Sequence, residues 1–264
     1  MLKQRILTAL ILAPVVIAII LKGNELAFTL FTAFLAMMIG YEWFQAVKNS
    51  PINSLVISAL VGLSLFFINK ASFIEIDVMR ILVAASIIWL ICFIWLFKPQ
   101  EGKIKYAKKY AIGVGVLLLF GASLISIHQL TINGVQLTLA LFLLVWVADI
   151  GAYVSGKTFG KHKLAPEVSP GKTIEGMLGG LVFTAIYGVI IASWLGYNWK
   201  YFVVFFPMIA VISVIGDLFA SLLKRHNNIK DSGFLLPGHG GFLDRFDSLI
   251  AATPFYFAFI HYIL

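Results

Sequence analysis

Charged side chains are scarce in this sequence of 264 residues, where Asp, Glu, Lys and Arg together make up only 12%. Soluble domains average about 25%, and here the shortage comes with a hydrophobic content of 61%. Cysteine is scarcer still. Cys92 stands alone inside an apolar run, which excludes an internal disulfide and favours a buried, inert thiol. These shortages exclude an ordinary soluble domain and predict an all-α, polytopic integral membrane protein.

The apolar N-terminal stretch lacks the small-residue cleavage site of a signal peptide, so we interpret it as a retained first membrane span. Low-complexity tracts, sequence repeats and gaps long enough for a soluble domain are missing too. A net charge of +8 would suggest nucleic-acid binding in a soluble protein. In a membrane protein the lysines serve to set orientation, and we expect no nucleic-acid partner.

Apolar runs of about 20 residues, enough to cross a bilayer as a helix, recur along the chain. We expect about nine spans, at residues 6–21, 26–47, 52–69, 80–97, 110–128, 136–155, 177–195, 201–223 and 248–264. If the N-terminus is cytoplasmic, 16 of the 20 Lys and Arg residues fall on the cytoplasmic side and 4 on the far side. This asymmetry predicts a cytoplasmic N-terminus and a C-terminus on the far side of the membrane.

The expected spans divide into two regions. Residues 1–135 hold spans one to five, which we assign to a lipid cavity or to subunit contacts in a homodimer. Residues 136–264 hold the last four spans and two polar cytoplasmic loops, 155–176 and 224–247. We expect the second region to be catalytic.

Three acidic residues fall inside expected spans: Glu42, Asp149 and Asp217. An ionised carboxylate at the centre of a membrane helix costs about 3 kcal/mol on insertion scales, so it needs a partner, a metal or water. All three lie near the cytoplasmic ends of their spans, which predicts an active site that opens to the cytosol. Each also has a simpler interpretation: snorkelling or a lysine pair for Glu42, a structural acceptor for Asp149, and a lone salt bridge for Asp217.

The segment "PGHGGFLDRFD", residues 237–247, combines glycines with acids. Its glycines are Gly238, Gly240 and Gly241. Glycine permits positive φ angles that turn backbone N–H groups inward as an anion-binding nest. Asp244 and Asp247 follow at a spacing of three, where N-capping of the last helix is the alternative to a functional role.

Asp217 and Asp244 offer hard oxygen ligands of the kind that Mg²⁺ takes together with substrate phosphate oxygens. Ser221 lies one turn after Asp217 on the same helical face. The nearby cations that suit phosphates are Lys224, Arg225, Lys230 and Arg245. A metal, a set of cations and a glycine-rich turn together predict phosphoryl or nucleotidyl transfer.

The stretch "SPGKT", residues 169–173, ends like a nucleotide-binding P-loop, but Pro166 stands where that loop carries its first glycine. A P-loop ATPase is therefore excluded. Lys172 and Thr173 still follow a tight turn and open a helix, whose N–H groups can bind an anion.

Residues 221–247 closely resemble the C-terminal motif of the phosphatidate cytidylyltransferases, also called CDP-diacylglycerol synthases. The family pattern is Ser-x-x-Lys-Arg, four residues, Lys-Asp-x-Gly, then Pro-x-His-Gly-Gly-x-x-Asp-Arg-x-Asp, and every fixed position is filled here. Residues 149–176 are similar to the family's second motif, although Ile174 replaces a tryptophan that many members have. In the first five spans the resemblance rests on the "YEW" of residues 41–43.

The resemblance implies a multi-helix membrane enzyme that joins CTP and phosphatidic acid to give CDP-diacylglycerol and pyrophosphate. It also implies Mg²⁺, alone or in a paired-cation site, with Asp217 and Asp244 as the metal-binding carboxylates. The lipid phosphate is already anionic at neutral pH and would attack the α-phosphorus of CTP in line. The four cations named above would neutralise the phosphates.

Further residues have expected roles in binding the substrates. The glycine turn would donate N–H groups to the triphosphate, and His239 would either donate to a phosphate oxygen or fix the turn. The residues that we assign to CTP are Lys157, Ser169 and Lys172. The residues that we expect to orient cations or add metal ligands are Asp149, Asp231 and Asp247.

Two other classes fit the sequence less well. A CDP-alcohol phosphotransferase carries an Asp-Gly-x-x-Ala-Arg run, which this sequence lacks. An ion-coupled transporter has polar groups at mid-depth on several helices, whereas here they gather at one interface. We therefore expect a lipid-modifying enzyme in the plasma (inner) membrane of a bacterium, with its active site facing the cytoplasm.

Overall fold

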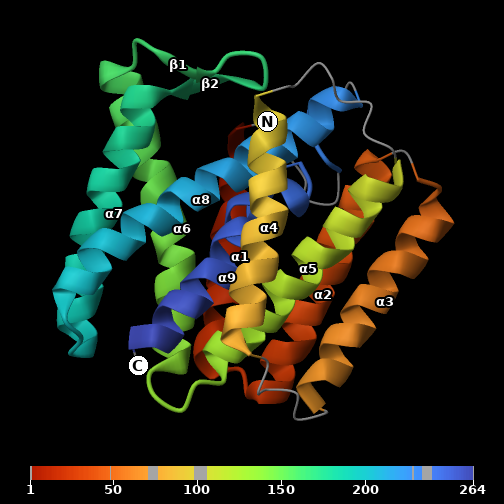
Figure 1. Ribbon diagram of the computed structural model, residues 1–264, viewed down its shortest axis with the longest axis horizontal. Helices are drawn as coiled ribbons and strands as arrows, with labels where there is room; N and C mark the ends of the chain where they lie inside the picture. The colour runs from red at the N-terminus through yellow and green to blue at the C-terminus, as the bar shows by residue number, and fades with distance from the viewer. Residues whose placement is uncertain are drawn as a thin grey trace.

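The computed structural model describes residues 2–47, 49–70, 77–97, 106–227, 229–233 and 240–263, which form nine helices and one β-hairpin (Figure 1). The helices are α1 (Leu2–Lys22), α2 (Glu25–Ala46), α3 (Pro51–Lys70), α4 (Val78–Leu96), α5 (Tyr106–His128), α6 (Gly134–Phe159), α7 (Ile174–Leu195), α8 (Trp199–His226) and α9 (Leu243–Ile263). The hairpin is β1 (Lys163–Ala165) and β2 (Ser169–Thr173), between α6 and α7.

Six of the helices in the described ranges are long and apolar enough to cross a membrane: α2, α4, α5, α6, α7 and α8. Shorter apolar helices occur within α1, at Leu10–Lys22, and within α3, at Pro51–Phe67. The protein is therefore a helical, polytopic membrane protein, as the composition predicts. Among the described residues, the hairpin is the one departure from an all-helical fold.

Four helices extend beyond the predicted spans into the polar loops. α6 continues to Phe159, α7 begins at Ile174, α8 continues to His226, and α9 begins at Leu243. The residues at these helix ends are polar, so they fall outside the hydrophobic runs that defined the predicted spans. Their backbone is nevertheless helical. Lys224 therefore lies in the last turns of α8, on the helical face that its spacing of seven from Asp217 predicts, and Asp244 lies in the first turn of α9.

The β-hairpin replaces most of the loop predicted at residues 155–176. Its antiparallel strands place Lys163 opposite Thr173. The carboxylate of Glu175, in the first turn of α7, accepts hydrogen bonds from the backbone N–H groups of Lys161 at 3.1 Å and His162 at 3.2 Å. These bonds fix the connection from α6 to the hairpin against the start of α7, and the hairpin holds Lys172 on β2.

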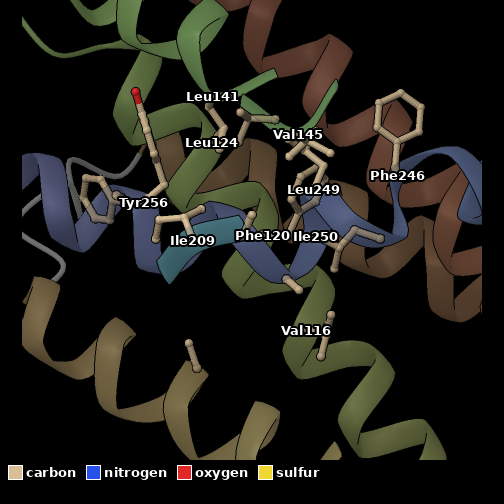
Figure 2. Close-up of a cluster of buried hydrophobic side chains, with 14 of the residues drawn as sticks. Val116, Phe120, Leu124, Leu141, Val145, Ile209, Phe246, Leu249, Ile250 and Tyr256 are labelled. Carbon is tan, nitrogen blue, oxygen red and sulfur yellow. The ribbon is translucent and has the colours of Figure 1, made fainter. Parts of the chain in front are cut away.

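α9 is buried in the centre of the bundle, packed against α2, α4, α5, α6 and α8 (Figure 1). Figure 2 shows Leu249 and Ile250 of α9 among buried side chains such as Phe120 of α5 and Leu141 of α6. Because α9 contacts helices from both predicted regions, one core joins them, and the boundary at residue 135 stays a prediction.

α8 approaches α9 closely at Gly216. A Cβ atom there would lie 2.6 Å from the backbone oxygen of Asp247 and 2.7 Å from the Cβ of Ala251. Only glycine permits this separation, because real Cβ atoms do not come so close to backbone oxygens. The contact aligns Asp217, the next residue of α8, with the N-terminal part of α9.

We expect Tyr256→Phe to lower the free energy of unfolding by about 1 kcal/mol, the usual scale for an interhelical hydrogen bond inside a membrane protein. Tyr256 is fully buried on α9, and its hydroxyl donates to the backbone oxygen of Leu137 on α6 at 3.0 Å. Unfolding in mixed detergent micelles measures the change. Tyr201→Phe, at an exposed position of α8, is the control and should have no measurable effect. Equal stability of the two variants would contradict a stabilising role for this bond.

Candidate active site

A cavity of about 640 Å³ lies between α1, α6, α8 and α9 and extends to residue 231. The acidic residues that line it are Asp149, Asp217, Asp231, Asp244 and Asp247. The opposite wall is apolar and includes Leu12 and Val16 of α1 and Phe142 of α6. Five separated segments of the chain thus bring carboxylates and apolar side chains to one space.

The charges around this cavity do not balance. Lys224 and Arg245 line it, and the Nζ of Lys172 forms an ion pair with Oδ2 of Asp217. Among the described residues of the site, five aspartate side chains face three cationic side chains. This excess of acidic groups suits a divalent cation, because carboxylate oxygens are the ligands that Mg²⁺ prefers.

Asp217 on α8 is held from two sides. Lys172 reaches it from β2, and the hydroxyl of Ser221 donates to its Oδ1 at a long distance of 3.4 Å. About a quarter of its side chain is exposed, so the carboxylate remains open to the cavity. Asp217 and Ser221 lie on one helical face, as their spacing predicts.

Asp244 on α9 has both oxygens engaged. The Nζ of Lys224 donates to Oδ1 at 2.5 Å, and the backbone N–H groups of Ser232 and Gly241 donate to Oδ2 at 2.8 and 3.1 Å. The side chain is 6% exposed. Asp244 therefore joins α8, α9 and the polar segments between them, and it is less open to a metal than Asp217.

Asp149 and Asp247 are the other carboxylates inside the helices that line the cavity. Asp247 is buried on α9, where its Oδ1 accepts from the N–H of Ser248 at 2.7 Å. Within the described ranges, no three acidic, His or Cys side chains are already arranged as a metal-binding group. This arrangement suits Mg²⁺, which usually takes one or two protein carboxylates and completes its shell with phosphate oxygens and water.

A second cavity, of about 380 Å³, lies between α6, α7, α8 and the hairpin. It is mostly apolar, but its lining includes Lys157 and Lys172. Asp149 and Asp217 line both cavities. These two aspartates therefore stand between an acidic space and an apolar one.

The remaining predicted residues are distributed as follows. Lys157 lies on the last turns of α6, with its Nζ 5.8 Å from the centre of the Tyr153 ring. Arg225, Lys230 and Ser169 line neither of these two cavities. Gly240 has a φ of 81°, as the anion-nest interpretation requires, and Gly241 donates to Asp244. Gly238 and His239 lie outside the described residues.

The comparisons with known proteins cover nearly the whole chain. A sequence model of the cytidylyltransferase family matches residues 3–263. The chain belongs to this family. A protein named phosphatidate cytidylyltransferase from Haemophilus influenzae is 31% identical over 288 residues, which cover 100% of both chains. Proteins of the same name are 34% identical in Pseudomonas aeruginosa, covering 98% of this chain and 97% of the relative, and 32% identical in Bacillus subtilis, covering 96% and 95%.

Sequence reasoning missed several residues of this cytidylyltransferase's site. Trp146 lines the acidic cavity one turn before Asp149, and this spacing of three on one helix was a usable signal. The apolar wall from α1 carried no signal, because its residues look like any other part of a membrane span. Ser232 also escaped notice, although it sits inside the matched motif and its N–H binds Asp244.

We expect purified protein to bind Mn²⁺, a spectroscopic substitute for Mg²⁺, and Asp217→Asn to weaken this binding by at least about tenfold. The reason is that the substitution removes a charged oxygen ligand that is open to the cavity. Electron paramagnetic resonance of free Mn²⁺ measures the affinity without any reaction. Asp77→Asn, which removes an exposed carboxylate paired with Arg80 at the start of α4, is the control and should bind like the unmodified protein. Unchanged binding by Asp217→Asn would exclude Asp217 as a ligand.

Proposed function

We propose that this protein transfers CMP from CTP to phosphatidic acid, giving CDP-diacylglycerol and pyrophosphate. The observation that carries the proposal is the similarity over the full length of the chain to relatives named phosphatidate cytidylyltransferase. The acidic cavity supports it, because its carboxylates and cations fit a reaction between two polyanions.

In the proposed reaction, an oxygen of the lipid phosphate monoester attacks the α-phosphorus of CTP. A new P–O bond forms, the bond from the α-phosphorus to the bridging oxygen breaks, and that oxygen leaves with pyrophosphate. The monoester is anionic at neutral pH, so the reaction needs no strong general base. The obstacle is repulsion between phosphates, and the residues that we assign to neutralising it are Lys172, Lys224, Arg225, Lys230 and Arg245.

A magnesium ion, when bound, would supply positive charge that neutralises the reacting phosphates. Asp217 fits the role of ligand best, because its carboxylate is open to the cavity. Asp244 is the second ligand implied by the family resemblance, but Lys224 and two backbone N–H groups occupy its oxygens. Asp149 and Asp247 line the same cavity and are the alternative second ligands.

The shape of the site suits an amphipathic substrate. The acidic cavity has an apolar wall that includes Leu12 of α1, and the second cavity is largely apolar. We assign these surfaces to the glycerol backbone and the first carbons of the acyl chains, which would enter sideways from the bilayer. CTP would then approach from the aqueous side, near Lys157 and the hairpin.

The proposed topology has nine spans, a cytoplasmic N-terminus and a C-terminus on the far side. Figure 1 shows the hairpin and the N marker at one end of the molecule and the C marker at the opposite end, which supports an odd number of crossings. The relatives are bacterial proteins, so we assign the chain to a bacterial inner membrane. A homodimer through residues 1–135 stays a prediction.

We expect the purified protein to convert labelled CTP and phosphatidic acid into a lipid-soluble product and pyrophosphate, and only with a divalent cation present. Asp217→Asn should lower kcat by at least about 100-fold, the scale for loss of one electrostatic contact to the reacting phosphates. Glu167→Gln, at an exposed position between the two strands of the hairpin, is the control and should keep full activity. Absence of product with the unmodified protein would overturn the proposed function.

The proposed topology can be tested with single cysteines in a Cys92→Ser background. We expect Glu167→Cys to react with a membrane-impermeant maleimide only from the cytoplasmic side, because the hairpin lies at that end of the bundle. Tyr262→Cys, at an exposed position near the end of α9, should react only from the opposite side. Labelling of both positions from one side would contradict an odd number of spans between the hairpin and the end of α9.

A further inference from the structure

Glu42 on α2 is a buried carboxylate that contacts a part of the chain about 200 residues away. Its side chain is 2% exposed, and it lines neither of the two cavities. Its Oε2 accepts a hydrogen bond from the hydroxyl of Ser232 at 2.8 Å and another from the backbone N–H of Leu243 at 2.8 Å. Snorkelling to the surface therefore does not describe this residue.

Glu42 and Asp244 both accept hydrogen bonds from the same two segments of the chain. Ser232 donates its hydroxyl to Glu42 and its N–H to Asp244. In the second segment, Leu243 donates its N–H to Glu42 and Gly241 donates its N–H to Asp244. The segments 229–233 and 240–243 are thus clamped between one carboxylate that lines the cavity and one that lies behind it.

Glycine is required where the two segments pass Glu42. A Cβ at Gly233 would lie 2.5 Å from Oε1 of Glu42, and a Cβ at Gly241 would overlap its carboxylate. Gly233 and Gly241 both lie in residues 221–247, the segment that resembles the family's C-terminal motif. This close approach gives them a specific role, which is to admit a carboxylate from another helix.

Glu42 also acts as a helix cap. Leu243 is the first residue of α9, and its N–H is one of the backbone donors that the helix itself cannot satisfy. A carboxylate at this point satisfies the donor and interacts favourably with the helix dipole. The cap comes from α2, so the start of α9 is fixed relative to the N-terminal helices.

We propose that Glu42 is a positioning residue for the reaction: it holds the first turn of α9, with Asp244 and Arg245, at the wall of the acidic cavity. The inference rests on the proposed function. It assigns to α2 a task in catalysis, although α2 provides no side chain to the cavity. A residue that served only to stabilise the fold would change the amount of folded protein and leave the turnover of each folded molecule unchanged.

The test measures kcat per folded molecule for four proteins: the unmodified chain, Glu42→Ala, Glu42→Gln and Ser232→Ala. We expect Glu42→Ala to lower kcat on the order of 100-fold, as displaced catalytic groups do. Glu42→Gln keeps an acceptor oxygen and should lose no more than about tenfold. Ser232→Ala should lower kcat about tenfold alone but less than about twofold when added to Glu42→Ala, because the two residues act through one contact.

Glu25→Gln is the matched control, since it removes a carboxylate from the exposed start of the same helix and should leave kcat unchanged. If Glu42→Ala does not fold, Glu42→Gln and Ser232→Ala decide the matter. Unchanged kcat in Ser232→Ala, or effects that simply multiply in the double variant, would overturn the inference. If the unmodified protein gives no product, the proposed function itself is wrong. If it gives product but Ser232→Ala keeps the same kcat, only the positioning role is wrong.

Discussion

Carboxylates at the edge of a membrane-embedded bundle must be offset by cations or by hydrogen-bond donors, because few water molecules can solvate them there. Five aspartates beside one cavity make this constraint severe. Lys172 offsets Asp217, while Lys224 and two backbone N–H groups offset Asp244. The hairpin, the end of α8 and the start of α9 are arranged around these contacts, and the charge that remains is the part available for a metal.

The burial of α9 makes this arrangement possible. A helix that faced lipid could not carry three charged residues in its first turns without exposing them to hydrocarbon. α9 instead lies inside the bundle, where α8 approaches it at Gly216 and Glu42 of α2 caps its first residue. The front half of the protein therefore contributes to the site through the position of α9, and through the apolar wall from α1.

The sequence predicted the class of fold and much of the site, for physical reasons. A hydrophobic content of 61% permits few structures other than a membrane bundle, and acids inside apolar runs demand a function or a partner. Asp149 and Asp217 were found in this way, whereas Asp244 and Asp247 were found in the glycine-rich segment, and all four line one cavity. The role of Glu42 was not predictable, because its partners lie about 200 residues away and only the fold brings them together.

The hairpin and the helix ends were missed for a different reason. Hydrophobic runs mark the part of a helix that lies in the membrane, whereas α6, α8 and α9 continue into polar sequence. Strands of three and five residues are too short to show an alternating pattern. As a result, Lys172 lies on a strand and Lys224 and Asp244 lie on helix ends, so regular secondary structure positions all three residues.

The two lysines explain how one set of contacts can serve both folding and the proposed reaction. An ammonium group has three donors, so Lys172 and Lys224 can each keep a carboxylate partner and still donate to a phosphate oxygen. Their carboxylates, in turn, hold the ammonium groups beside the cavity in the absence of substrate. The arrival of phosphates then requires no large movement of charge, and preorganised cations of this kind are the main source of stabilisation for phosphoryl transfer. The aspartates that are costly in a membrane protein thus hold in place the two lysines that we propose to bind phosphate.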